Sequence, residues 1–180
     1  MGQHQYTTGS GKSKHTTPVM FVAVDMPKTL PHVAIDRNNN SFNVGDDFER
    51  SQRYSMEGDF DKYFTVYCPK GYERDLLYFL TPELMQALVE MHKDYDVEII
   101  GKKLYFYQGG NKTYTAESLQ AVFKLINLVG GEVAENTHRY VDARAADGKT
   151  ETAQLKRRTI AWTTVAVVLV YAAMLLIAYL

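Results

Sequence analysis

The sequence has only one cysteine, Cys68, which excludes an internal disulfide bond and a zinc site built from several cysteines. It also lacks a strong net charge, because the formal charge at pH 7 is only −1. Domains that bind nucleic acids are usually strongly basic. We therefore expect no nucleic-acid partner, and the lone cysteine suits a reducing compartment such as the cytoplasm.

Motifs that would reveal an enzyme are missing as well. There is no Gly-x-Ser-x-Gly sequence, no dinucleotide fingerprint and no zinc-protease helix. None of the five histidines has a second His or Cys at metal-ligand spacing. Residues 36–61 hold seven acidic side chains and three arginines, which predicts a solvated acidic face, with a divalent-cation site as the alternative. We predict no catalytic, cofactor-binding or metal-binding residue and no cofactor.

Long apolar runs are absent except at residues 160–180, where no side chain is charged. As a helix, this stretch would be about 31 Å long, close to the roughly 30 Å hydrocarbon core of a bilayer. Lys156, Arg157 and Arg158 precede it, and Trp162 suits the interface between membrane and water. Because basic flanks stay on the cytoplasmic side, we predict a single-pass, tail-anchored protein of the cell inner membrane with a cytoplasmic N-terminal domain.

The rest of the chain divides by composition. Residues 1–17 are polar and are expected to be a disordered leader. Residues 18–141 have enough apolar side chains for one cytoplasmic α+β domain. Residues 142–156 read as a linker, and residues 157–180 as the transmembrane anchor.

Apolar spacing within the domain predicts a small antiparallel sheet with two main helices on one face, followed by one C-terminal transmembrane helix. Thr81 and Pro82 are typical of a helix start, and Gly130-Gly131 is expected to cap or kink the last helix. Two β-favouring runs about Gly101-Lys102 predict a hairpin. The predicted strands cover residues 19–24, 32–36, 63–67, 97–100 and 103–107, and the predicted helices cover 72–80, 81–94 and 115–129.

Tyrosine is abundant, with thirteen residues. Because tyrosine combines apolar area with a polar tip, it suits protein interfaces, although alternate tyrosines on a strand can simply pack in the core. The possible interaction face consists of Tyr63, Tyr67, Tyr105 and Tyr107. These residues favour a membrane-anchored binding or scaffold protein with a protein partner. A membrane-bound enzyme of unrecognised type and an accessory subunit of a membrane complex are the alternatives.

Several short motifs occur in an order that resembles a known family. They are Phe-Asp-Lys-Tyr-Phe at 60–64, Tyr-Cys-Pro at 67–69, Leu-Thr-Pro at 80–82, Asp-Tyr-Asp-Val-Glu-Ile at 94–99 and Leu-Tyr-Phe-Tyr at 104–107. The chain resembles an uncharacterised family of bacterial membrane proteins, a domain of unknown function common in Saccharibacteria and related candidate phyla. The resemblance spans about residues 27–140. It implies a cytoplasmic α+β domain tied to membrane helices, and it brings no catalytic residues.

Overall fold

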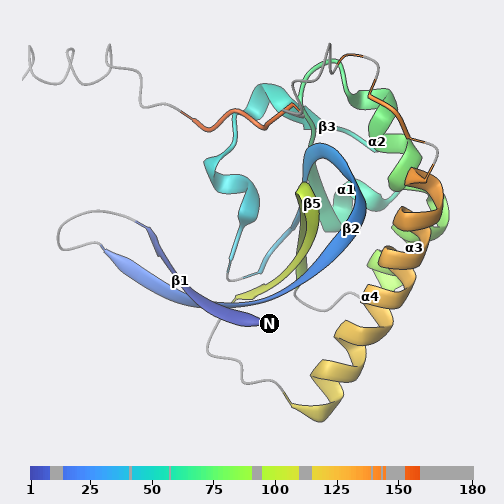
Figure 1. The fold of residues 1–180 in the computed structure, drawn as a ribbon. Helices are drawn as coiled ribbons and strands as arrows, with labels where there is room; N and C mark the ends of the chain where they lie inside the picture. Colours follow the sequence, from blue (N-terminus) through green and yellow to red (C-terminus); the bar gives the residue numbers. More distant parts are fainter. Residues whose placement is uncertain are drawn as a thin grey trace, which may run out of the picture.

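A computed structural model describes residues 1–8, 14–40, 42–56, 58–90, 95–109, 115–138, 140–142, 144 and 153–158. This part of the chain is α+β, as predicted: an antiparallel five-stranded sheet with helices packed on one side (Figure 1). The strands are β1 (Gly2–Thr8), β2 (His15–Arg37), β3 (Arg53–Tyr54), β4 (Phe64–Tyr67) and β5 (Tyr95–Gly109). The helices are α1 (Phe60–Tyr63), α2 (Glu73–Phe79), α3 (Pro82–Glu90) and α4 (Ala116–Thr137), with 3-10 turns η2 (Val44–Asp47) and η3 (Arg50–Gln52).

Strand β2 is the centre of the sheet. Its first part lies between β1 and β5, and its last part lies between β4 and β5. The two separate strands expected at residues 19–24 and 32–36 are therefore one strand of 23 residues. The pairing of β2 with β5 is irregular between Asp25 and Val33. This interval contains Pro27 and Pro31, which have no backbone N–H to donate to the ladder.

The predicted hairpin at Gly101-Lys102 is wrong. Residues 95–109 form one strand, β5, which runs along β2 throughout. Gly101 has a positive φ of 60°, a conformation that glycine adopts without strain, and it lies opposite the irregular stretch of β2. Both strands therefore bend together, and the sheet folds over into a strongly curved ribbon with a convex and a concave face (Figure 1).

The helices cover the convex face. Alternate residues of β2 and β5, among them Val22, Leu30, Leu104 and Phe106, form the main core with α2, α3 and α4. The predicted helix start is confirmed, because the Leu84 N–H donates to the Thr81 hydroxyl at 3.3 Å, directly before α3. Helix α4 continues through Gly130-Gly131 and ends only at Thr137, so these glycines do not cap it.

A second, smaller core lies on the concave face, under η2 and η3. It contains Ala34, Phe48, Tyr67 and Leu155. Leu155 belongs to residues 153–158, of which 153–156 were expected to be linker, yet this segment lies along the domain. Its backbone pairs with His32, Phe48, Glu49 and Asp47. The folded unit therefore includes these six residues.

The N-terminal residues also differ from the expected disordered leader. Gly2–Thr8 pair with residues 15–21 of β2 as strand β1. Main-chain hydrogen bonds hold this pairing, so it does not require the apolar side chains that the segment lacks. Residues 160–180, the predicted span, lie outside the described residues. Among the helices in the described ranges, none is long and apolar enough to cross a membrane.

Candidate functional site: an aromatic groove on the concave face

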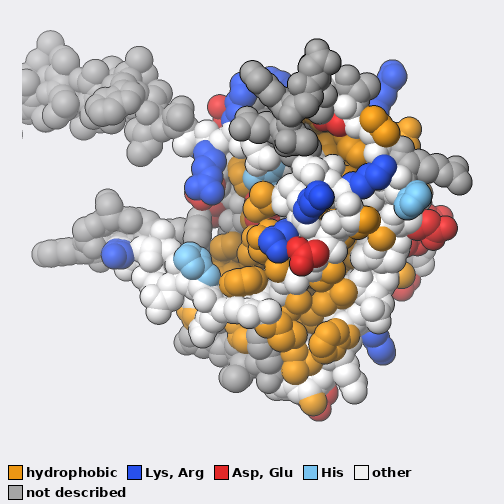
Figure 2. Space-filling view, in the orientation of Figure 1, with side chains coloured by type: hydrophobic (Ala, Val, Ile, Leu, Met, Phe, Trp, Pro, Cys, Tyr) orange, Lys and Arg blue, Asp and Glu red, His pale blue; other side chains and the backbone are white. Residues whose placement is uncertain are grey.

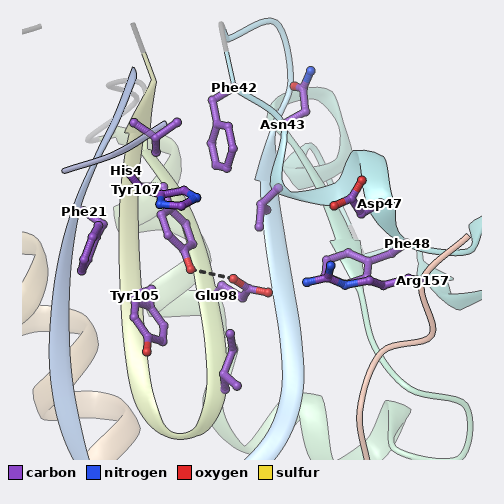
Figure 3. Close-up of a pocket in the computed structure, with 13 residues that line it drawn as sticks. His4, Phe21, Phe42, Asn43, Asp47, Phe48, Glu98, Tyr105, Tyr107 and Arg157 are labelled. Atoms are coloured by element: carbon purple, nitrogen blue, oxygen red, sulfur yellow. Dashed lines mark hydrogen bonds between the residues drawn. The ribbon is translucent and has the colours of Figure 1, made fainter. Parts of the chain in front are cut away.

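The bend of the sheet creates a groove of about 360 Å³ on the concave face. Its walls come from β1, both limbs of β5, the start of β2, the loop that leads into η2, and the C-terminal segment (Figure 3). Hydrophobic side chains gather on this side of the molecule, next to the arm formed by β1 and β2 (Figure 2). The lining residues are His4, Val19, Phe21, Phe42, Asn43, Val44, Asp47, Phe48, Glu98, Ile100, Tyr105, Tyr107 and Arg157.

Four aromatic rings form one continuous row along the groove. Tyr105 and Tyr107 are two residues apart on β5, so their side chains share a face, and their rings are stacked with centroids 5.7 Å apart. Phe42 packs against Tyr107 at 5.6 Å, and Phe21 against Tyr105 at 6.3 Å. The row joins β2, β5 and the loop before η2 into one largely apolar surface.

Glu98 fixes the position of Tyr107. Its Oε2 accepts a 2.8 Å hydrogen bond from the Tyr107 hydroxyl, across the fold of β5 (Figure 3). Burial, followed by the nearby Glu98 carboxylate, raises the pKa of Tyr107 far above its ordinary value, so this hydroxyl remains a donor. The other oxygen of Glu98 lies 2.7 Å from Nε2 of His32. Because both carboxylate oxygens are engaged, Glu98 holds the two limbs of the sheet together.

His32 extends this network to the C-terminal segment. Its Nδ1 lies 3.3 Å from the Leu155 N–H and accepts a hydrogen bond from it. The Nε2 atom therefore carries the proton and donates to Glu98. A continuous chain of contacts thus joins Tyr107 in the groove to the segment at residues 153–158.

The C-terminal segment supplies one wall of the groove. Gln52 binds both main-chain groups of Lys156, at 2.8 and 2.9 Å, and so fixes the segment in an extended conformation. Side chains of an extended segment alternate in direction. Leu155 is buried in the smaller core, Arg157 lines the aromatic groove, and Arg158 lines a separate polar cavity. Trp162, the fourth residue predicted to flank the membrane, lies outside the described residues.

The structure brings together half of the predicted interaction face. Tyr105 and Tyr107 share the groove, whereas Tyr67 is buried beneath η2 and contributes to the polar cavity. Tyr63 ends helix α1, packs against the main core and lies under the Arg37 guanidinium, 5.7 Å from the ring centroid. Tyr63 and Tyr67 thus lie outside the aromatic groove.

Sequence reasoning missed Phe21, Phe42, Phe48 and Glu98 as groove residues. The alternation along β5 provided a signal for Glu98, because Val97 and Ile99 face the main core and the residue between them must face the other way. Phe42 and Phe48 lie in a stretch with no regular period, so only the three-dimensional structure reveals them.

Two carboxyl groups, Asp36 and Asp96, are buried side by side at the far end of the concave face. Asp36 follows Ile35 and Asp96 precedes Val97, and these two neighbours pair across the strands. The two carboxyl groups are hydrogen-bonded to each other. Burial raises the pKa of Asp36 to about 6 and that of Asp96 well above its ordinary value. Asp36 is therefore not part of a solvated acidic face. Within the described ranges, no three His, Cys, Asp or Glu side chains come together to hold a metal ion.

The chain matches no protein-family model, no curated protein and no solved structure. Its function therefore has to be inferred from its own geometry.

Proposed function

We propose that this chain is a membrane-anchored binding protein whose aromatic groove accepts an apolar side chain of a partner protein. The row of Phe21, Tyr105, Tyr107 and Phe42 supports this proposal most directly. Interfaces depend on a few large anchors that enter desolvated pockets lined by aromatic residues. A groove of about 360 Å³ has room for such an anchor, with Arg157 at its edge to meet a neighbouring carboxylate.

The polar network beside the groove favours binding over catalysis. Glu98 uses one oxygen for Tyr107 and the other for His32, and His32 uses its second nitrogen for the Leu155 N–H. A general base needs a free site that can take a proton from a substrate. These contacts instead make the groove rigid, which lowers the entropic cost of binding a partner.

Residues 160–180 supply the anchor in this proposal, and the basic residues before them keep the domain at the cytoplasmic face of the inner membrane. Cell fractionation tests the anchor: the full chain should sediment with membranes, and a chain that lacks residues 160–180 should not. If the full chain remains in the supernatant, the proposed membrane anchor is refuted. The proposed binding function of the groove is tested separately.

Site-specific cross-linking tests the groove. A photoreactive phenylalanine analogue at Ile100, which is 37% exposed at the groove, should join the chain to a partner in cells. The added change Tyr105→Ala should remove that product, because it deletes the middle of the aromatic row. The matched control places the same analogue at Phe123, which is 53% exposed on α4, outside the groove lining. Products that persist with Tyr105→Ala, or that form equally well at Phe123, would contradict the proposal.

A further inference from the structure

A second cavity, of about 500 Å³, lies on the other side of η2 from the aromatic groove. Its lining is polar, and Tyr67 is the one aromatic residue among the described residues that form it. The charged residues around it are Arg50, Arg53, Lys62, Arg158, Asp36 and Asp46. Four basic side chains and two acidic ones therefore line the cavity, which gives it an excess of positive charge.

Two of the arginines are held in place. The Nε of Arg158 donates to the Phe48 carbonyl at 2.6 Å, and its backbone N–H donates to the Asp47 carbonyl at 2.6 Å. The Nη2 of Arg53 donates to the Thr65 hydroxyl at 3.1 Å, and its guanidinium lies over the Tyr67 ring. Each guanidinium keeps further N–H groups that these contacts do not use.

Within the part of the chain that the structure describes, the three arginines lack acidic partners. Among the described residues, no carboxylate lies within ion-pair distance of Arg50, Arg53 or Arg158, whereas Lys62 pairs with Asp59 at 2.6 Å. Like charges gathered around one cavity repel each other unless an anion enters it. A guanidinium binds phosphate oxygens through two parallel hydrogen bonds, which makes arginine well suited to phosphate recognition.

The acidic residues reduce this positive potential only in part. Asp36 shares a buried contact with Asp96 and accepts hydrogen bonds from the backbone N–H groups of Val44 and Gly45. Burial raises its pKa to about 6, so near neutral pH Asp36 carries less negative charge than an exposed aspartate does. Asp46 is exposed and, of the two described carboxylates that line the cavity, is the one that competes more directly with an anion.

We propose that this cavity binds a phosphate group, supplied either by an anionic lipid headgroup or by free phosphate. The arginine geometry alone supports the site, while the lipid source also rests on the proposed anchor. Arg158 lies two residues before the predicted span, so an anchored domain would bring the cavity close to the headgroups. The phosphate oxygens would lie between Arg53 and Arg158, with Arg50 as a third donor.

Calorimetric titration of the full chain in a non-ionic detergent tests the site. The probes are inorganic phosphate, the short-chain lipid dihexanoyl phosphatidylglycerol, and glycerol as a neutral headgroup control. We expect saturable binding of at least one phosphate probe and none of glycerol. Binding of inorganic phosphate would identify a site for the free anion, and binding of the lipid alone would identify a headgroup site. Absence of binding by both phosphate probes would overturn the proposal.

Variants then locate the site. Arg53→Gln and Arg50→Gln should each weaken phosphate binding by about tenfold, because each removes a charge-assisted hydrogen bond. Arg50→Lys should retain part of the affinity. The control, Arg74→Gln, removes an exposed arginine from α2, outside the lining of the cavity. Arg50 is exposed, and its side chain makes no hydrogen bond or ion pair with another described residue, so its variant remains informative if Arg53→Gln fails to fold. Equal weakening by Arg74→Gln would refute this location.

Phosphate binding does not depend on the aromatic groove or on residues 160–180. A chain that lacks those residues, or that carries Tyr105→Ala, should bind phosphate as the full chain does. The two proposals can therefore fail separately.

Discussion

The buried pair of Asp36 and Asp96 predicts that the protein becomes less stable as the pH rises. In the folded protein these carboxyls hold a proton more tightly than they do in the unfolded chain, chiefly because burial penalises their ionised forms. The negative charge of Asp46 adds to this effect at Asp36, and the charge of Asp36 adds to it at Asp96. Their contribution to stability is full below the unfolded pKa of 3.8. It is lost as the pH rises through about 6 for Asp36, and at still higher pH for Asp96.

The size of the stability change follows from the pKa shift of Asp36. The pKa of Asp36 rises from 3.8 to about 6, and each pKa unit corresponds to about 1.4 kcal/mol. The free energy of unfolding should therefore fall by up to about 3 kcal/mol between about pH 4 and pH 7. Asp36→Asn keeps an oxygen that can accept from Val44 and Gly45, and its new amide N–H can donate to Asp96. We expect the variant to be more stable than the parent by about 1–3 kcal/mol at neutral pH.

Urea unfolding of the full chain in detergent, followed by circular dichroism over this pH range, measures the effect. The control is Asp25→Asn, which changes an exposed carboxylate that pairs with Lys103 and should shift stability by under about 1 kcal/mol. If Asp36→Asn gives the same pH profile as the parent, or is less stable at neutral pH, the pair does not carry the charge penalty that its burial implies.

Two further predictions concern other buried side chains. Because Leu155 is only 6% exposed, Leu155→Ala should lower the free energy of unfolding by about 2–3 kcal/mol and speed amide exchange at Lys156 and Arg158. The control, Lys156→Ala, removes an exposed side chain from the same segment and should do neither. Unchanged exchange in Leu155→Ala would show that the segment does not depend on the burial of Leu155. The thiol of Cys68, whose pKa burial raises to about 12, should react with iodoacetamide far more slowly in the native protein than in urea, and equal rates in both would contradict its burial.

The convex side of the fold could be predicted from the sequence. The apolar spacing of residues 72–80 and 115–129, and the Thr81-Pro82 helix start, are local signals, and α2, α3 and α4 follow them. The bend of the sheet could not be predicted in the same way. A glycine between two β-favouring runs fits a hairpin as well as a bent strand. The choice depends on pairing with β2, whose prolines are some 70 residues away in the sequence.

The candidate site, like the fold, could be predicted from the sequence only in part. Tyr105 and Tyr107 could be assigned to one face because their spacing is that of a strand. The docking of residues 153–158 could not be predicted, because it depends mainly on backbone hydrogen bonds and on the side chain of Gln52, more than 100 residues away. A single leucine among polar residues gives no periodic signal.

The docked segment also determines how the domain would respond to mechanical load. A pull on the chain from beyond Arg158 would meet the contacts of residues 158, 156 and 155 in turn, so that they break one at a time. The contacts between β2 and β5 extend over most of both strands, lie deeper and would have to yield together. The segment should therefore peel away while the sheet remains intact, which removes Arg157 from the aromatic groove and Arg158 from the polar cavity. Tension on the chain would weaken both sites before it unfolds the domain.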